Sequence, residues 1–444
     1  MTRVVATIGV LLALMLASGC GSSKKSSSET NGSKKVAPAT ISIWTPFVNP
    51  ELVTFKSVIK DFEAAHPGFH VKVVGGTNDD KIVAAIRGGN APDVAQSFSS
   101  DNTGAFCPSG AWIDLGPYLK QDGVKGTIFP TAPREYTVFE GKRCALPMLA
   151  DTYGLYYNKT LLAKAGIKSP PKTISELTAD AKKLTQRSSG GKLKVVGFNP
   201  FWGWYENAVA HYAPSWGAKW VDEQGNSVLG KGTAWSDLAS WQKSLIDYYG
   251  YDKLVRWQAG AGDEFAPSHP FETGKLAMML DGEWRVAFIK KEHPTLKYGT
   301  APFPAADDDP SLYGAGYVTG SILGIPKTSK HKDQAWLLVK YLATNDDALA
   351  KLSNGIQNVP TTTASLHSPL LKPLPGFQTF LDVFGDANTT TTPITRIGAA
   401  NQETFQSFIS KYMSGSKTDL EGGLANVDKQ IDAQLKQSEA GQAP

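Results

Sequence analysis

Over residues 41–100 the spacing of apolar residues alternates between that of a strand and that of a helix. Three short segments are apolar or alternate with polar neighbours and predict strands: 41–44, 71–74 and a stretch beginning at Val94. Apolar residues at helical spacing separate them and predict two amphipathic helices, the first carrying Phe55, Val58, Ile59 and Phe62 and the second Ile82, Val83 and Ile86. This alternation predicts an α/β fold, with mostly parallel sheets flanked by helices.

The stretch 271–288 changes character three times. An unbroken apolar run at 276–280 predicts a buried strand, two small polar residues then predict a turn, and residues 286–291 predict a helix. The turn places Trp284 just beyond the carboxyl end of a strand, where open α/β sheets bind ligands. Its indole either stacks on a ligand or fills a gap in the structure, and the local sequence favours neither.

A second group of rings lies in the loop at 199–207, directly after the strand predicted at 195–198. Trp202 and Trp204 are the most prominent members of this loop, which interleaves rings with polar side chains. Such a density of rings in a loop is hard to explain by core packing alone, so we expect at least one of the two tryptophans to contact a ligand. Trp235 and Trp241 instead repeat at helical spacing and are predicted to belong to the core.

Length and charge narrow the class of protein. A chain of 444 residues exceeds what one hydrophobic core usually supports, so we expect two domains. The net charge of +4 comes from residues 1–39, which hold five basic and one acidic side chains and leave 40 of each sign in the rest. A neutral body lacks the basic surface that nucleic-acid binding requires, so we expect no nucleic-acid partner.

The first 39 residues predict export and attachment. Arg3, an apolar run at 4–16 and small residues before Cys20 form a signal peptide that is too short to span a membrane. The segment ending at Cys20 resembles the lipobox of bacterial lipoproteins, although Ala17 replaces the usual leucine. The resemblance implies that Cys20 is lipidated, and the Ser-, Lys- and Gly-rich stretch 21–39 fits a disordered tether.

Two further cysteines, Cys107 and Cys144, invite a disulfide in an exported protein, although two free buried thiols are the alternative. A catalytic cysteine is less favoured, since neither lies in a motif with a histidine. A metal site has little support. His66 and His70 are four residues apart, but Pro67 and Gly68 interrupt the helix that would align them.

Five motifs then follow one another in an order typical of one known family. Their residues are Ala91-Pro92-Asp93-Val94; Ala145-Leu146-Pro147 with Asp151 and residues 154–159; Phe271, Gly274, Lys275, Ala277, Met278, Met279, Gly282 and Trp284; Gly324-Ile325-Pro326-Lys327 with Ser329 and Lys330; and Val359-Pro360. By these motifs the chain resembles the family 1 extracellular solute-binding proteins of ABC importers, the class that includes maltose-binding protein. The resemblance covers residues from about 41 to 365.

That resemblance implies two α/β lobes joined by a hinge that the chain crosses three times, with a carbohydrate held in the cleft. We place the crossings near residues 149–153, 314–317 and 355–359. The expected organisation is a signal peptide at 1–19, a lipidated cysteine and tether at 20–39, a first lobe at 40–150 with 316–355, and a second lobe at 151–315 with 356–444.

A neutral polyol offers an apolar face to aromatic rings and a rim of hydroxyl groups to carboxylates. Asp151, which matches the acidic hinge residue of the family, is the first choice as hydroxyl acceptor, and Asp101 is the second. Asp151 could instead tie down the hinge, and Asp101 could cap a helix. The expected ligand-binding residues are Trp284, Asp151, Tyr153, Trp202, Trp204, Asp101, Ser97, Thr45, Gly316 and Tyr317. The threonine-rich stretch 388–393 with Arg396 either reaches the cleft or is a solvated linker.

The resemblance therefore predicts a monomeric, extracytoplasmic lipoprotein without cofactor or enzymatic activity that delivers a sugar to the permease of an ABC importer. The main alternative is a secreted glycoside hydrolase, for which Asp281 with Glu283, or Asp151 with Glu206, are the carboxyl pairs to consider. A phosphorylated polyol is a second alternative, and it would need Arg285 or Arg396 turned toward the ligand.

Overall fold

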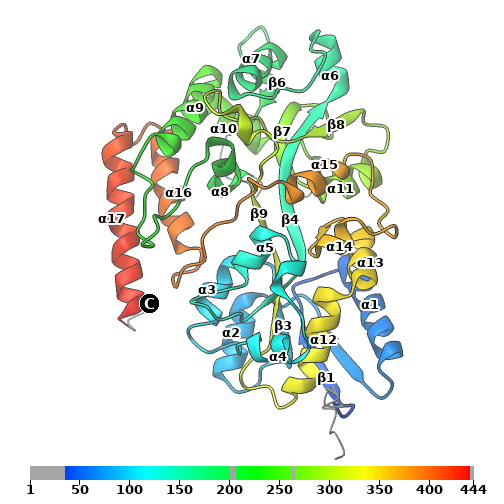
Figure 1. Cartoon of the computed structure of the whole chain (residues 1–444). Helices are drawn as coiled ribbons and strands as arrows, with labels where there is room; N and C mark the ends of the chain where they lie inside the picture. Colours follow the sequence, from blue (N-terminus) through cyan, green and yellow to red (C-terminus); the bar gives the residue numbers. More distant parts are fainter. Residues whose placement is uncertain (1–35, 201–203, 205–206, 263, 265, 441–444) are drawn as a thin grey trace, which may run out of the picture. The chain divides into compact units, whose positions relative to one another are not determined.

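The strand β4 (Leu146–Asn158) connects the two halves of one sheet, and it can be followed in Figure 1 as the longest strand. The computed structural model describes residues 36–440, apart from 201–203, 205–206, 263 and 265. Within this part of the chain the sheet order is β2-β1-β3-β9-β4-β7-β6-β5, with β10 and β8 also paired to β4. The other strands are β1 (Thr40–Trp44), β2 (His70–Val74), β3 (Val94–Ser97), β5 (Gln186–Arg187), β6 (Leu193–Phe198), β7 (Leu276–Gly282), β8 (Tyr298–Ala301), β9 (Val318–Gly324) and β10 (Val359–Pro360).

Helices flank this sheet and follow most of its strands. The α-helices of the described residues are α1 (Glu51–Ala65), α2 (Asp79–Arg87), α3 (Thr103–Phe106), α4 (Gly116–Gln121), α5 (Thr131–Tyr136), α6 (Lys159–Lys164), α7 (Ile174–Leu184), α8 (Val209–Tyr212), α9 (Ala234–Tyr249), α10 (Tyr251–Ala259), α11 (Arg285–Glu292), α12 (Lys332–Thr344), α13 (Asp346–Ile356), α14 (Thr363–Leu366), α15 (Gln378–Gly385), α16 (Ala400–Met413) and α17 (Leu420–Glu439).

The sheet is mixed, which corrects the prediction of mostly parallel sheets. Strands β2, β1 and β3 are mutually parallel, as are β6 and β7, but β4 is antiparallel to β7, β8, β9 and β10. The spacing of apolar residues reveals strands that are joined by a helix, and such neighbouring strands form the parallel pairs. It does not detect the long strands that return through the middle of the sheet, because their partners are distant in sequence.

Strand β4 changes partners in the middle. Its first half pairs with β9, ending with Thr152 opposite Val318, and its second half pairs with β7, beginning with Tyr153 opposite Gly282. The change lies within the stretch where we expected the first hinge crossing, whereas the lobe boundaries themselves remain a prediction. Two hydrophobic clusters lie along the sheet, a smaller one around β1, α1, α12 and α13 and a larger one around β4, β6, β7 and α9.

Local sequence signals explain several helix ends. Thr173 accepts a hydrogen bond from the Glu176 backbone N–H at the start of α7. At α2 the capping residue is Asn78, and Asp79 and Asp80 occupy the first turn. Asn345 ends α12 and caps α13, so these two helices follow each other directly.

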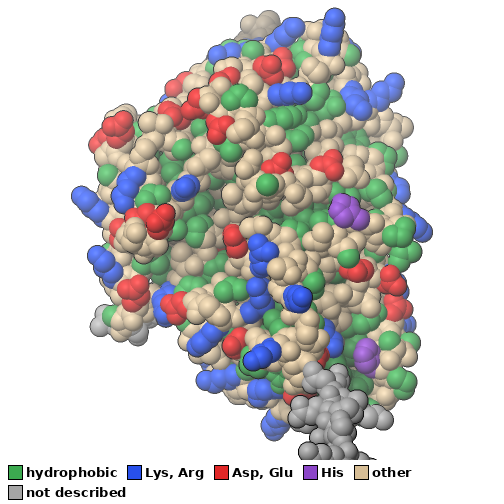
Figure 2. Space-filling model, in the orientation of Figure 1, with side chains coloured by type: hydrophobic (Ala, Val, Ile, Leu, Met, Phe, Trp, Pro, Cys, Tyr) green, Lys and Arg blue, Asp and Glu red, His purple; other side chains and the backbone are tan. Residues whose placement is uncertain are grey.

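Cys107 and Cys144 are joined by a disulfide, with their Cα atoms 5.5 Å apart. This agrees with the pairing that the sequence favoured. In the part of the chain that is described, no helix is long and apolar enough to cross a membrane. On the face shown in Figure 2, basic and acidic side chains are interspersed, in keeping with the neutral charge of the folded body.

Candidate functional site

Four rings gather where β4 changes partners. Tyr153 on β4 stacks on His211 of α8, with ring centroids 3.6 Å apart, and the Trp284 ring meets it edge to face at 5.6 Å. Tyr317, directly before β9, lies 5.9 Å from Tyr153 and 5.0 Å from His211. The predicted residues Tyr153, Trp284 and Tyr317 therefore share one cluster. We call these three residues and His211 the aromatic cluster.

Trp284 is half-buried in this cluster. The residue stands at the beginning of α11, and its ring lies over Gly282 so closely that a Cβ atom there would be 2.2 Å from it. The glycine in this turn is thus required for the position of the ring. Turn and strand signals had placed the indole after β7 correctly, although Asp281 and Gly282 belong to the strand itself.

Two carboxyl groups lie beside the aromatic cluster and share one donor. The Asn358 Nδ2 group donates to Asp151 Oδ1 at 2.5 Å and to Glu283 Oε1 at 2.7 Å, and the Thr152 N–H donates to Glu283 Oε2 at 2.7 Å. Burial raises the pKa of Asp151 to about 7; the Asn358 hydrogen bond opposes this rise and Glu51 adds to it. Burial and the charge of Asp151 raise the pKa of Glu283 well above its ordinary value. We call Asp151 and Glu283 the acid pair; Asn358 bridges them.

A second acidic cluster starts two residues earlier in the same turn. The fully buried Arg285 donates to Asp281 Oδ2 at 2.5 Å and to Glu272 Oε1 at 3.4 Å. Burial raises the pKa of Asp281, and Arg285 offsets part of that rise. Arg285 is therefore committed to the protein interior, which removes it as a phosphate-binding group. Asp281 is likewise bound to a cation and is unsuited to act with Glu283 as a hydrolytic pair.

Asp101 forms a third polar group, joined to a segment distant in sequence. The Gln402 Nε2 group donates to Asp101 Oδ2 at 3.0 Å and to Thr392 Oγ1 at 3.2 Å, and the Thr392 and Tyr317 hydroxyls are 2.8 Å apart. Burial raises the pKa of Asp101 to about 6, and the Gln402 hydrogen bond opposes the rise. Its Oδ1 atom is buried without a hydrogen-bond partner among the described residues. The neighbouring short helices have no side-chain cap, so Asp101 does not act as a helix cap.

The segment from Thr389 to Gln402 is ordered against the rest of the site. The Thr390 N–H donates to the Gly316 carbonyl at 3.0 Å, and the Val318 N–H donates to the Thr390 carbonyl at 2.9 Å. Thr392 is fully buried, and Arg396 pairs with Glu140. Of the two possibilities that the sequence left open, the structure supports a packed segment rather than a solvated linker. Arg396 is occupied by Glu140 in this arrangement.

Three further predicted residues use their polar groups within the protein. Thr45 Oγ1 donates to Gln96 Oε1 at 2.7 Å, and Ser97 Oγ donates to Asp79 Oδ2 at 3.0 Å; both threonine and serine are fully buried. The Gly316 N–H donates to Thr389 Oγ1 at 3.0 Å. These contacts satisfy the three polar groups within the protein, and a direct ligand role for them stays a prediction.

The remaining predicted residues lie at the edge of, or outside, what the structure describes. Trp204 is half-buried, with its ring 5.3 Å from that of His269. Trp202, Glu206 and Cys20 lie outside the described residues. The pair Asp151 and Glu206 therefore has no described geometry.

Four residues of the site were not predicted: His211, Glu283 as a partner of Asp151, Asn358 and Gln402. Asn358 had a detectable signal, since it lies within the predicted hinge crossing at 355–359 and directly before the Val359-Pro360 motif. His211 and Gln402 lie in ordinary helical sequence. Their contacts depend on chain crossings that no local pattern encodes.

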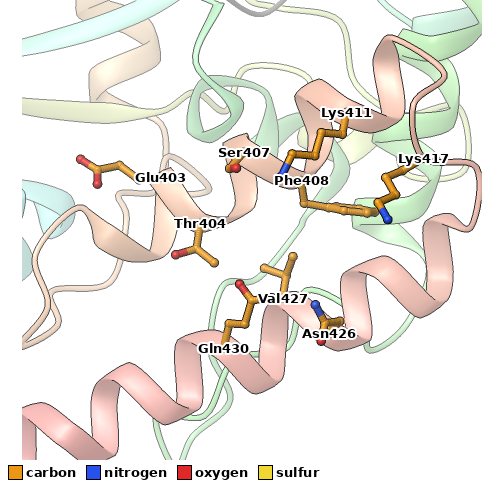
Figure 3. A pocket seen from close by; sticks show the side chains of 9 residues that line it. All are labelled: Glu403, Thr404, Ser407, Phe408, Lys411, Lys417, Asn426, Val427 and Gln430. Carbon is orange, nitrogen blue, oxygen red and sulfur yellow. The ribbon is translucent and has the colours of Figure 1, made fainter.

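Two surface cavities lie elsewhere. One, of about 420 Å³, opens between α16 and α17 and is lined by Phe408 together with exposed charged residues such as Glu403, Lys411 and Lys417 (Figure 3). The other, of about 630 Å³, lies along α2 and α3. Neither contains any residue of the aromatic cluster or the acid pair. Among the described residues there is no group of three or more His, Cys, Asp or Glu side chains arranged to hold a metal.

The mixed α/β architecture, with a sheet divided at β4 and a polar aromatic site at the division, defines a two-domain ligand-binding fold of the periplasmic-binding-protein type. Residues 49–349 match the family described as bacterial extracellular solute-binding protein, and the chain belongs to that family. The predicted α/β fold of the periplasmic-binding-protein type is therefore confirmed, with a mixed sheet in place of mostly parallel ones.

Individual relatives agree in fold and sequence. A binding protein of Brucella abortus is 31% identical over 300 residues, which cover 66% of this chain and 69% of the relative. The diacetylchitobiose binding protein DasA of Streptomyces coelicolor is 25% identical over 376 residues, covering 82% and 84% of the two chains. A solved structure, CpMnBP1 with mannotriose bound, superposes with a TM-score of 0.76 at 27% identity and covers 89% of this chain and 100% of that one.

Proposed function

We propose that this protein is the substrate-binding lipoprotein of a carbohydrate ABC importer and that it binds a mono- to oligosaccharide between its two lobes. The observation that carries the proposal is the aromatic cluster beside the acid pair, at the point where β4 changes partner strands. Rings match the apolar face of a sugar, and carboxyl and amide groups match its hydroxyl rim. The family and the sugar-binding relatives support the same reading.

The proposed mechanism is closure on the sugar. Tyr153 and Asp151 belong to β4, Trp284 follows β7, and Asp101 follows β3, so a sugar in contact with all four would touch elements on both sides of the hinge. Only the closed arrangement makes every contact, and a sugar therefore shifts the population toward closure. The permease would then recognise the closed form.

We also propose that Cys20 is acylated and anchors the protein to the outer face of the cell membrane. The support is the lipobox-like sequence ahead of Cys20 and the tether that follows it. A relative from Streptococcus pneumoniae, 25% identical over 353 residues, is named a maltooligosaccharide ABC transporter solute-binding lipoprotein. Mass spectrometry of the membrane-extracted protein should detect an acylated Cys20, and Cys20→Ala should release the protein into the soluble fraction. Cys20→Ala that remains membrane-bound would contradict the anchor.

A thermal-shift screen tests the sugar. Protein lacking residues 1–39 is heated with mannobiose, mannotriose, maltotriose and diacetylchitobiose, each supplied well above its expected dissociation constant. A ligand at a hundred times that constant stabilises by about 2.7 kcal/mol, which a melting curve resolves easily. We expect at least one sugar to raise the melting temperature.

The same samples distinguish binding from hydrolysis. Chromatography of the sugars after prolonged incubation should recover them intact. If no sugar of a larger panel raises the melting temperature, sugar binding is contradicted. If chromatography finds shortened products, the hydrolase is favoured. No contact in the described structure favours the hydrolase, because Asp281 is paired with Arg285.

A further inference from the structure

The acid pair differs from an ordinary ligand-binding carboxylate, because two acids meet without a cation. Asp151 and Glu283 lie within two hydrogen-bond lengths of each other, since both accept from the same Asn358 nitrogen. Glu283 is fully buried and Asp151 partly so. Two carboxylates this close in a desolvated place cannot both ionise at little cost. Such a pair retains a proton at a pH where each acid alone would lose it.

The surroundings supply no competing positive charge. The groups that act on Asp151 are Asn358, Glu51 at the start of α1 and Tyr136 of α5, and those that act on Glu283 are Asp151, Asn358 and the backbone around Thr152. Tyr156 of β4 faces both Glu283 and the neighbouring Asp281–Arg285 pair. The Arg285 guanidinium is bound to Asp281 and Glu272. In the described part of the chain, therefore, no lysine or arginine neutralises the pair.

Hydrogen bonding decides which oxygen holds the proton. Both oxygens of Glu283 already accept hydrogen bonds, one from Asn358 and one from the Thr152 backbone, which favours the ionised form of that residue. Asp151 accepts through Oδ1, whereas no described residue donates to its Oδ2 atom. These hydrogen bonds favour a proton of the pair on Asp151 Oδ2, the oxygen of the partly exposed side chain, even though the charge of Asp151 in turn raises the pKa of Glu283.

We propose that Glu283 is a positioning residue that keeps Asp151 protonated, so that Asp151 donates a hydrogen bond to an uncharged oxygen of the sugar instead of only accepting one. The inference rests on the proposed sugar-binding function. It reverses the role that the sequence suggested for Asp151, that of a hydroxyl acceptor. It also requires sugar affinity to depend on pH, because loss of the shared proton removes the donor and leaves two facing negative charges.

The direction of that dependence follows from the proton count. The protonated pair binds the sugar and the doubly ionised pair does not, so affinity is greatest below the pKa of the pair and declines above it. The dissociation constant should rise by roughly tenfold for each pH unit above that pKa. Glu283→Gln removes the second negative charge, which lets Asp151 ionise at lower pH and moves the decline toward acid pH. Asp151→Asn cannot titrate at this position, so whatever affinity it retains should lack the decline above the pKa of the pair and keep only the dependence due to other acids such as Asp101.

The experiment is a calorimetric titration of mannotriose and of maltotriose between pH 5 and pH 9 into the wild-type protein, Glu283→Gln and Asp151→Asn. Asp180→Asn on α7 is the matched control, because burial raises the pKa of Asp180 too but this residue lies outside the site. We expect the midpoint of the affinity profile to move to lower pH in Glu283→Gln and to stay in place in Asp180→Asn. An unchanged midpoint in Glu283→Gln would overturn the proposal.

A measurement without sugar separates this proposal from the proposed function. Infrared spectra of the ligand-free protein at neutral pH should contain the carbonyl band of protonated carboxylic acids, and Asp151→Asn should weaken it while Asp180→Asn leaves it unchanged. If Asp151→Asn weakens the band but neither sugar binds, the choice of sugar or the proposed function fails and the proton on Asp151 stands. If Asp151→Asn leaves the band of the folded protein unchanged, the proposal is wrong even if a sugar binds.

Discussion

The segment from Asp281 to Arg285, in which the chain leaves β7 and enters α11, sends its side chains into two acidic clusters that are stabilised in different ways. Asp281 and Arg285 turn toward Glu272, where a guanidinium faces two carboxyl groups. Glu283 turns the other way, toward Asp151 and Asn358, where no cation is present among the described residues. Trp284 stands between them in the sequence and carries the half-exposed ring of the site.

One short segment thus combines a buried ion pair that stabilises the fold with an acid pair that can titrate. In the first cluster the Arg285 guanidinium stays charged and offsets part of the rise in the pKa of Asp281 that burial causes, so the ion pair anchors α11 to the strand before it. We call Arg285, Asp281 and Glu272 the fixed cluster. The second cluster can change its charge by gaining or losing a proton, because carboxyl groups titrate in the physiological range when burial raises their pKa. The fixed cluster holds the turn in place, and the titratable cluster faces the aromatic site.

The largest effect on the free energy of unfolding should come from removing Arg285, the cation of the fixed cluster. Arg285→Leu leaves Asp281 and Glu272 buried without the arginine charge; Asp281 keeps the Gly282 N–H and Glu272 keeps His293 at 3.7 Å. Breaking a buried ion pair in this way costs about 3–5 kcal/mol. We expect urea unfolding to show a loss of that size. The double variant Arg285→Leu with Asp281→Leu should recover part of it, because one stranded charge is gone. A loss below about 1 kcal/mol would show that the cluster does not anchor the turn.

Trp284→Ala should affect binding more than folding. Trp284 is half-buried and not part of the fully buried core, so its removal should leave the protein folded, but a stacked aromatic at the centre of a site commonly contributes about 2–4 kcal/mol to binding. We expect the thermal shift produced by the bound sugar to disappear. The matched control is Trp216→Ala, which removes another half-buried ring that contacts Trp241, away from the aromatic cluster. Retained affinity in Trp284→Ala would remove the ring from the site.

The acid pair should make the free energy of unfolding depend on pH up to neutrality, because the pKa of Asp151 is raised to about 7. In the unfolded chain Asp151 has its ordinary pKa, whereas burial raises it to about 7 in the folded protein. The folded protein therefore binds more protons between these values, and its free energy of unfolding declines as pH rises from about 4 to about 7, by up to about 1.4 kcal/mol per pH unit. Urea unfolding at several pH values measures the slope. Asp151→Asn should reduce it, and an equal slope in that variant would contradict the shared proton.

The sequence predicted local elements well and the pairing of distant segments less well. Apolar periodicity placed α1, β7 and α9, and the motif around Trp284 placed the indole at the site, because each depends on neighbouring residues alone. The antiparallel course of β4 and β9 was missed, since a strand's rhythm does not specify its partner.

The chemistry of the site shows the same limit. Asp151 was identified by its motif, but its partner Glu283 is 132 residues away and meets it only because Tyr153 pairs with Gly282 across the sheet. Glu283 looked locally like a partner of Asp281, from which it is two residues distant on the strand and turn. Residues two apart along a strand share a face, but the chain leaves the strand after Gly282 and separates the two side chains. No local rule gives that departure.

The smallest effect should come from an exposed counterpart of the fixed cluster. Arg396 pairs with Glu140 at the surface, where solvent screens the charges, and such pairs contribute about 0–1 kcal/mol to stability. Arg396→Met should therefore leave urea unfolding almost unchanged, in contrast to Arg285→Leu.

The effect of Arg396→Met on sugar binding is more informative, because Arg396 lies in the segment that joins Thr392 to Gln402 and Asp101. If this segment is held by its buried threonines, as the contacts of Thr389, Thr390 and Thr392 indicate, affinity measured by calorimetry should change less than threefold. A larger decrease would mean that the surface pair, and not the buried threonines, keeps the segment against the site.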